Sequence, residues 1–307
     1  GAKPPKGQEL EDHYFGPIKL RVSAFMKELD EELWKLGIFA KTEHNEVAPS
    51  QHELAPIFTV TNLASDQNQL IMETMKKVAT RHGLYCLLHE KPFAGVNGSG
   101  KHNNWSMSTD KGMMAVIAAV DDYQDLLRLT VTSAGNDHRL GANEAPPAIV
   151  SIYLGEELQE VIDALEHGVK YKGKTKQIMK LGVDTLPELP KDTTDRNRTS
   201  PFAFTGNKFE FRMLGSTFSM AGPNNIVNTI VAEELRRFAD ELEGAKDFNA
   251  ALHELVVKTI KAHKRIIFNG NNYSEEWTKE AEKRGLLNLK NSAEALPRFA
   301  DKKNVEM

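Results

Sequence analysis

Apolar residues recur along this chain with two different periods, and these periods limit what it can fold into. Steps of three and four residues, typical of helices with one buried face, run through residues 18–36, 65–82, 225–243 and 248–268. Strict alternation, typical of a strand, runs through residues 101–107 and 208–214. The sequence therefore predicts a mixture of helices and strands, although these periods do not give the order of the strands.

Further segments complete this first description. An apolar stretch at residues 113–120 continues through 122–131 as a third helix, and residues 85–93 are predicted to form a buried strand. Residues 166–205 are rich in Lys, Gly, Asp, Thr and Pro, which indicates a long surface loop of the kind that is commonly functional. A short charged helix is expected at residues 275–284, followed by a polar tail.

The composition is that of a soluble globular protein whose partners are small molecules. Of the 307 residues, 40% are hydrophobic and 27% are charged, and the 39 basic and 43 acidic residues give a formal charge of -4. This near balance argues against nucleic acid as a partner, because nucleic-acid binders usually concentrate a basic excess on one face.

Cysteine content and hydropathy limit the kinds of site and the cellular location that are expected. Cys86 is the single cysteine of the sequence, so an intrachain disulfide and a cysteine-based zinc site are excluded, and a cytoplasmic location is predicted. The longest apolar run, residues 112–120, is far below the ~20 residues that a membrane-spanning helix needs, so no contact with a membrane is expected. The first residues lack the order of a signal peptide and include no initiator methionine, which we interpret as a fragment boundary.

The alternating segment at residues 208–214 places charged side chains on one face of a strand. Lys208, Glu210 and Arg212 share that face, and apolar side chains occupy the other. Two interpretations are open: a solvated sheet face with an ion pair, or a face that lines a cleft. The segment alone favours the solvated face.

A second alternating segment follows a glycine-rich turn. His102, Asn104 and Ser106 lie on one face, directly after glycines at positions 95, 98 and 100 that allow the backbone to approach a ligand closely. The turn matches neither a Walker loop nor a dinucleotide fingerprint. A glycine turn is weak evidence, and a lone histidine is more often structural than a ligand.

Two glutamates near a proline form the third group. A continuous strand would put Glu46 and Glu53 on opposite faces, whereas a turn at Pro49 and Ser50 could bring both carboxylates to one pocket. Converging carboxylates suit Mg²⁺ or Mn²⁺, which prefer oxygen ligands. The plainer alternative is a solvated pair of strands.

Arginines supply the complementary charge. They stand at Arg139, at Arg196 and Arg198 in the long loop, and at Arg212 on the alternating strand. Guanidinium groups pair with carboxylate and phosphate through two parallel hydrogen bonds. Carboxylates, a histidine and arginines together suggest metal-assisted phosphoryl chemistry on an acidic substrate.

Taken in order, these motifs resemble the catalytic domain of glutamine synthetase, of the large bacterial type III subfamily. The resemblance covers essentially the whole chain through the segments HNEVAPSQHE, KPFAGVNGSGKHNNWS, NDHRLGANEAPP, RNRTSPFAF, NKFEFRMLGS and HKRIIFNGNNYSEEW. Each motif is weak alone, but they are specific as an ordered set.

The resemblance implies a fold, a reaction and partners. The fold is α+β, with a curved, largely antiparallel sheet and helices on its outer face, and residues 1–307 form the catalytic domain with a C-terminal extension at 269–307. The reaction is ATP-dependent ligation of ammonia to the side-chain carboxylate of glutamate through γ-glutamyl phosphate, with Mg²⁺ or Mn²⁺ bound. Full-length members are cytoplasmic, ring-forming homo-oligomers resembling dodecamers.

Positions that match the family's motifs take its roles. Glu46 and Glu53 correspond to ligands of the metal on the glutamate side, and His102 and Glu210 to ligands of the metal that bridges the nucleotide phosphates. On the glutamate side, Asn97 and Gly98 correspond to positions that bind the amino group, and Arg139 to the position that binds the carboxylate. Glu144 corresponds to the flap glutamate that takes a proton from ammonium. Arg198 and Arg212 correspond to arginines against the phosphates, and Asn104, Ser106 and Arg198 to positions that contact the nucleotide.

The sequence also departs from the family pattern. Ala203 stands where a further arginine is usual, and Asn104 stands where many relatives have a second histidine. The helix at residue 113 follows residues 109–111 sooner than expected, and neither the family's upstream strand with paired glutamates nor its N-terminal domain is found. Two alternatives therefore stay open: a related ligase that joins glutamate to another amine, and a catalytically silent binding module that keeps the fold.

Overall fold

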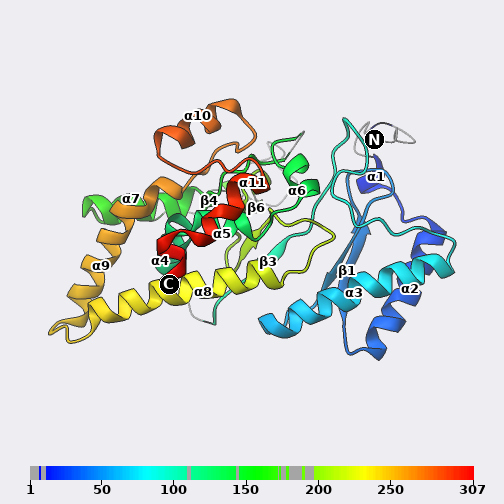
Figure 1. Ribbon diagram of the computed structural model, residues 1–307, viewed down its shortest axis with the longest axis horizontal. Helices are drawn as coiled ribbons and strands as arrows, with labels where there is room; N and C mark the ends of the chain where they lie inside the picture. The colour runs from blue at the N-terminus through cyan, green and yellow to red at the C-terminus, as the bar shows by residue number, and fades with distance from the viewer. Residues whose placement is uncertain are drawn as a thin grey trace.

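The computed structural model of the protein describes residue 7 and residues 12–108, 112–142, 145–171, 173, 178–179, 189–190 and 197–307. Its N-terminal elements lie to one side of a larger body that holds most of the helices (Figure 1). No helix in these described ranges is long and apolar enough to cross a membrane.

The N-terminal unit packs two helices against a hairpin. Its elements are α1 (Asp12–Phe15), α2 (Leu20–Lys35), β1 (Ala40–Asn45), β2 (His52–Pro56) and α3 (Thr61–Arg81). Apolar residues at helical spacing on α2 and α3 meet in one small core of Leu29, Leu33, Ile71 and Val78, which Ile38 joins from the connection after α2. Both predicted helices are confirmed, and α3 begins four residues earlier than expected. A two-stranded sheet is marginal alone, so this helical packing is what stabilises the hairpin.

The larger body is built on a four-stranded sheet with the order β3-β8-β7-β4. Its strands are β3 (Asn103–Trp105), β8 (Phe209–Phe211), β7 (Phe202–Phe204) and β4 (Ile152–Tyr153). The β3–β8 and β8–β7 pairs are antiparallel, and the β7–β4 pair is parallel. The predicted α+β class with a largely antiparallel sheet is therefore confirmed, with one parallel pair that the sequence periods did not reveal.

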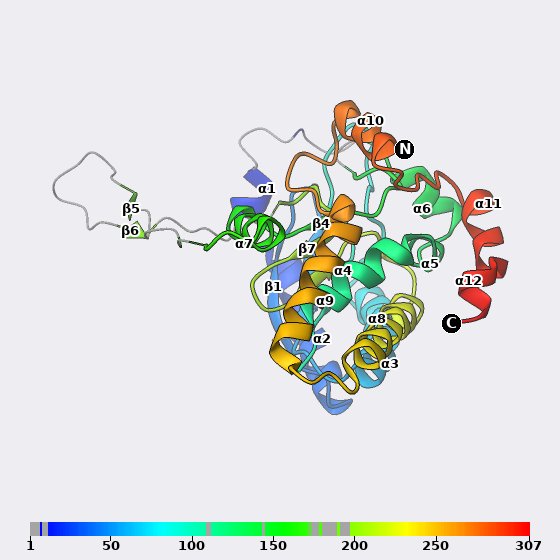
Figure 2. The same ribbon diagram turned by 90° about the vertical axis from the view of Figure 1, so that its left-hand side faces the viewer.

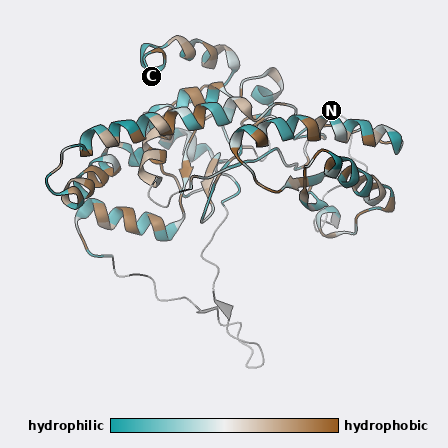
Figure 3. Ribbon diagram, turned by 90° about the horizontal axis from the view of Figure 1, so that it is seen from below, coloured by the Kyte–Doolittle hydropathy of each residue, from teal (hydrophilic) through white to brown (hydrophobic). Residues whose placement is uncertain are grey.

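Helices cover this sheet and supply most of the core. The apolar faces of α4 (Met113–Asp122), α8 (Ala221–Leu242) and α9 (Phe248–His263) pack with the sheet's phenylalanines in one large cluster. Figure 3 shows hydrophilic and hydrophobic residues on the same helices, as expected of helices with one buried face. The remaining elements are α5 (Gln124–Leu129), α6 (Ala134–Arg139), α7 (Glu156–His167), α10 (Glu275–Lys283), α11 (Ser292–Ala295), α12 (Lys302–Val305), two short 3₁₀ turns, and the pair β5 (Ile178–Met179) and β6 (Leu189–Pro190), which lies away from the body (Figure 2).

Two predicted elements are wrong in instructive ways. The helix expected through residues 113–131 breaks at Tyr123, whose φ of -120° and ψ of 30° lie outside the helical range, so it becomes α4 and α5. The strand expected at residues 85–93 does not form, and Tyr85 is 87% exposed. The carbonyls of His89 and Glu90 accept hydrogen bonds from the Gln51 side chain, so at these two residues a side chain takes the place of a strand partner.

The end of the chain is more ordered than the polar tail that was expected. The helix at residues 275–284 is confirmed as α10, and short helices follow it. Leu286, Leu289 and Ala295 are buried, and the Asn304 amide donates to a carboxylate oxygen of Asp125. Scattered apolar residues without a period anchor this segment, which is why the pattern did not show it. Half of the loop predicted at residues 166–205 lies outside the described residues.

A buried ion network joins α4 to the end of α9. The Asp121 carboxylate is within 3.0 Å of both His263 Nδ1 and Arg265 Nε. Burial alone would lower the pKa of His263, but the hydrogen bond to Asp121 and the charges of Asp121 and Asp122 outweigh it and raise the pKa. The folded state therefore favours the protonated imidazole.

Replacing His263 with Gln is expected to destabilise the protein by about 1.5–3 kcal/mol at about pH 5.5, the contribution of a hydrogen bond to a charged group. The loss should shrink towards about pH 9, because this stabilisation is complete below the ordinary histidine pKa and disappears as pH rises through the raised folded-state value. Urea unfolding at both pH values measures the difference. His253→Gln, at an exposed position on the same helix, is the control, and an equal pH dependence in both variants would contradict the assignment.

Candidate active site

The hairpin of β1 and β2 brings the two predicted glutamates together. Its turn closes with a hydrogen bond from Glu46 N to Gln51 O, and Ser50 adopts a left-handed φ of 60°. His44 lies directly opposite Glu53 across the strands. As a result, His44 Nε2 is 3.2 Å from Glu46 Oε1 and 3.1 Å from Glu53 Oε2. The turn interpretation of this segment is therefore confirmed.

The same geometry adds a residue that the sequence argument missed. His44, Glu46 and Glu53 each offer one ligand atom, and these atoms lie within 4.8 Å of one another. His44 stands two residues before Glu46 on the same strand face, so the period of two was a signal for it. One imidazole nitrogen and two carboxylates form a donor set that suits Mg²⁺ or, with its nitrogen, Mn²⁺.

The Glu46 carboxylate is held in its charged form. Only 12% of its side chain is exposed, and this burial favours the neutral acid. Hydrogen bonds with Glu53 and Ser99 and the adjacent His44 outweigh the burial, so the pKa of Glu46 lies below its ordinary value. An ionised carboxylate is the form that binds a metal.

His13 fastens the turn from the outside. Its Nδ1 donates to the carbonyl of Glu46 at 2.7 Å, and its Nε2 accepts from the backbone N–H of Ser50 at 3.0 Å. These two roles need a neutral ring with the proton on Nδ1. One side chain therefore fixes both ends of the turn that sets the separation of the two glutamates.

The predicted glycine turn does allow a close backbone approach. A Cβ at Gly98 would lie 2.3 Å from the carbonyl oxygen of Glu90, and a Cβ at Gly100 would lie 3.1 Å from Arg139 Nη1. The carbonyl of Gly98 accepts a hydrogen bond from Lys91 Nζ at 2.9 Å. This carbonyl therefore already binds an ammonium group of the protein.

The charged face of β8 is buried, so the solvated interpretation of that strand is wrong. Glu210 is 2% exposed and Arg212 is 7% exposed. Arg212 Nη2 donates to Glu210 Oε2 at 2.7 Å, and Lys208 Nζ lies 3.6 Å from Glu210 Oε1. Contacts from outside the strand, such as the carbonyls of Asn197 and Ser200 that accept from Arg212, accompany this burial, and a single-strand pattern cannot reveal them.

Arg212 also joins more distant segments. Its Nη1 donates to the carbonyls of Asn197 and Ser200, which end the long loop. Arg139 at the end of α6 donates from Nη2 to the carbonyl of Arg212 at 2.7 Å and from Nη1 to the carbonyl of Leu214 at 2.5 Å. Both predicted arginines are therefore buried together, with these donors directed at backbone oxygens.

His102 lies between the two groups of charges. It precedes β3, and the register of β3 on β8 extends to place it opposite Arg212. Burial of the imidazole among protein atoms, together with the charges of Arg212 and Arg139, lowers the pKa of His102 to about 4. The charges of Glu210 and Glu46 oppose this shift. The ring is neutral, as a metal ligand must be.

Comparison with known proteins settles the relationship. The family profile described as glutamine synthetase, catalytic domain, matches residues 5–135, and that of the glutamine synthetase C-terminal domain matches residues 251–307. A type-3 glutamine synthetase from Dictyostelium discoideum is 50% identical across 100% of this chain and 45% of its own length. A glutamine synthetase from Butyrivibrio fibrisolvens is 53% identical across 100% of this chain and 47% of its own length. The chain belongs to the glutamine synthetase family.

The predicted resemblance to the type III subfamily is therefore confirmed, and the chain spans under half the length of these relatives. A solved structure described as apo GmaS without ligand aligns with 94% of this chain and 63% of that chain, with a TM-score of 0.50 at 13% identity. That likeness supports the glutamine synthetase catalytic-domain fold.

The other positions that match glutamine synthetase motifs are less closely gathered. Asn104 and Ser106 are exposed, and Asn104 pairs directly across from Glu210. Arg198 is exposed, and its carbonyl accepts from the Tyr273 hydroxyl at 3.4 Å. Asn97 is half-buried beside Gly98, and Glu144 lies outside the described residues. Of the four predicted metal ligands, Glu46 and Glu53 fall in the cluster with His44, whereas His102 and Glu210 do not join it within 4.8 Å.

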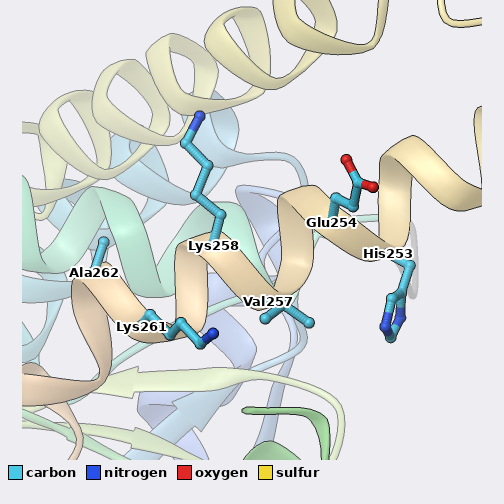
Figure 4. Close-up of a pocket in the computed structure, with 6 residues that line it drawn as sticks. All are labelled: His253, Glu254, Val257, Lys258, Lys261 and Ala262. Carbon is cyan, nitrogen blue, oxygen red and sulfur yellow. The ribbon is translucent and has the colours of Figure 1, made fainter. Parts of the chain in front are cut away.

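A separate surface hollow includes none of these matched residues. It is lined by His253, Glu254, Val257, Lys258, Lys261 and Ala262 of α9 (Figure 4). Lys258 is paired with Glu241 at 2.6 Å. None of the residues that line this hollow is among the predicted site residues.

Gly98→Ala is expected to destabilise the protein by about 1–3 kcal/mol, because the new methyl group would overlap the backbone oxygen of Glu90. Gly135→Ala, within α6 and with no atom within 4 Å of its added Cβ, should be neutral or stabilising by up to about 1 kcal/mol. Urea unfolding of both variants provides the comparison. Equal stability of Gly98→Ala and the unmodified chain would show that this close approach does not constrain the loop.

Proposed function

We propose that this chain carries most of an active site that ligates ammonia to the side-chain carboxylate of glutamate, driven by ATP, through γ-glutamyl phosphate. The observation that carries the proposal is the convergence of His44, Glu46 and Glu53 within a motif that the family shares. Relatives named glutamine synthetase align with the whole chain at 50% and 53% identity, which supports this reaction over a ligase for another amine.

The residues present fit a divalent metal. Glu46 and Glu53, with His44 beside them, would hold one Mg²⁺ or Mn²⁺, and His102 and Glu210 would contribute to a second. When bound, these metals would neutralise the repulsion between a carboxylate and a triphosphate that must approach each other. The lowered pKa of Glu46 and the neutral ring of His102 keep both groups ready to bind a metal.

The remaining groups would bind and orient the substrates. Arg139 and Arg212 place two positive charges beside the glycine turn, where the carboxylate of glutamate and the transferred phosphate would lie. The Gly98 carbonyl would exchange the Lys91 ammonium for the amino group of glutamate. We assign Asn97 to the same end of the substrate.

Nucleotide and flap roles follow from the family motifs. Asn104, Ser106 and Arg198 would contact ATP, and Arg198 and Arg212 would neutralise its phosphates. Glu144 would close the site and take a proton from ammonium. Closure would exclude water from the acyl phosphate, which would otherwise hydrolyse. The whole protein would act in the cytoplasm as a ring-shaped homo-oligomer resembling a dodecamer.

Glu53→Gln is expected to weaken Mn²⁺ binding by about tenfold or more, because it removes one of two converging carboxylates. Calorimetric titration of Mn²⁺, with and without a non-hydrolysable ATP analogue, measures the effect. Glu73→Gln, on α3 and paired only at the surface with Lys77, is the matched control and should bind as the unmodified chain does.

Turnover is tested separately with glutamate, ATP and a panel of amines, following ADP release. Release that requires ammonia supports the proposed reaction, and release with another amine but not ammonia would favour the related ligase. An unmodified chain that binds neither Mn²⁺ nor the nucleotide would point to the silent module instead.

A further inference from the structure

Gln51 connects the acidic hairpin to the glycine turn. It is the last residue of the turn between β1 and β2, five positions after Glu46. Its Nε2 donates to the carbonyls of Ser99, His89 and Glu90 at 3.0, 3.3 and 3.4 Å, and its Oε1 accepts from the backbone N–H of Ser99 at 2.8 Å. One side chain therefore binds both backbone groups of Ser99.

Ser99 extends this connection to a proposed metal ligand. Its hydroxyl donates to Glu46 Oε2 at 2.8 Å, while the other oxygen of Glu46 faces His44. The backbone of Ser99 is fixed by Gln51, so the direction of its hydroxyl is fixed as well. Gly98, the proposed acceptor for the amino group of glutamate, is the residue immediately before it.

We propose that Gln51 is a positioning residue that couples metal binding at the hairpin to the arrangement of the glycine turn. This inference rests on the proposed function, because it takes Glu46 and Glu53 as metal ligands and residues 97–100 as substrate-binding. Gln51 itself touches neither metal nor substrate in this scheme. It acts by holding the two parts of the site at one separation.

The chemistry of the amide explains why this position needs glutamine. The contacts require one acceptor for the Ser99 N–H and donors for the carbonyls, and a carboxamide offers both. Its two N–H hydrogens are shared among three carbonyl oxygens, of which Ser99 O is the nearest at 3.0 Å. A glutamate of the same size would place a negative charge against those carbonyls, and a methionine would supply neither donor nor acceptor. Either change leaves backbone groups of residues 89–99 without the partner that they have here.

The loop at residues 94–100 has little regular structure of its own, so its position depends on the hydrogen bonds from Gln51. Residues 94–100 form no strand, and Gly95 has a left-handed φ of 71°, so little regular structure orders this stretch. On its other side the loop is held through Glu90, whose Oε1 accepts from the backbone N–H of Ser216. Gln51 thus fixes the loop to the hairpin, whereas Glu90 fixes it to the segment that follows β8.

The test uses amide hydrogen exchange, followed by mass spectrometry, on the 307-residue chain with Mn²⁺ alone. In the unmodified chain, Mn²⁺ should slow exchange in the hairpin and also in residues 95–100, by about fivefold or more. In Gln51→Met the hairpin should still respond to Mn²⁺, while the response of residues 95–100 is lost. Gln51→Glu should behave in the same way and serves as a second variant if Gln51→Met does not fold.

Gln69→Met, the same substitution at an exposed position of α3, is the matched control and should keep both responses. Protection of residues 95–100 by Mn²⁺ that persists in both Gln51 variants would overturn the inference and leave the proposed function intact. Protection confined to the hairpin of the unmodified chain would also overturn the inference alone. An unmodified chain in which Mn²⁺ protects neither segment would overturn both.

Discussion

The buried pairing of Arg212 with Glu210 is the interaction on which the rest of the site depends. Breaking such a pair by removing one partner typically costs 3–5 kcal/mol, because the other charge stays buried without compensation. Arg212 also donates to the loop carbonyl of Asn197, and its own carbonyl accepts from Arg139. The ion pair therefore aligns strand β8, the end of the long loop and helix α6. Arg212 reaches the loop through its guanidinium group and α6 through its backbone carbonyl, so one residue connects the three segments.

Local patterns predicted the elements whose cause is local. The amphipathic periods of α2, α3, α8 and α9 follow from one buried face on each helix, and the alternation at residues 208–214 predicted which side chains of β8 share a face. The turn at Pro49 and Ser50 was also readable, because proline and serine are both common in turns. Position-by-position resemblance supplied the roles that chemistry alone left open.

Features with a tertiary cause could not be predicted in this way. The break at Tyr123 interrupts an apolar run that has no glycine or proline to mark it. Residues 85–93 were predicted to form a buried strand, yet the carbonyls of His89 and Glu90 accept from a glutamine side chain of a distant turn. The buried Glu210 is paired with Arg212, whose further contacts with Asn197 and Arg139 lie outside the alternating segment. The partners of residues 89 and 90 and of Arg212 lie outside the segments whose patterns were used for prediction.

The site lies where the N-terminal unit meets the larger body, so its geometry depends on how firmly the two are joined. Lys101 Nζ donates to Asn68 on α3 and to the carbonyl of Phe218, and burial lowers the pKa of Lys101 to about 8. Asn224 of α8 donates to the Ser65 hydroxyl of α3 at 3.2 Å within the buried interface. These polar contacts are directional, so a displacement of α3 along α8 would break them, whereas purely apolar packing would tolerate sliding. The separation between the hairpin carboxylates and the charges on β8 is therefore set by hydrogen bonds at this junction, in addition to the packing of either unit.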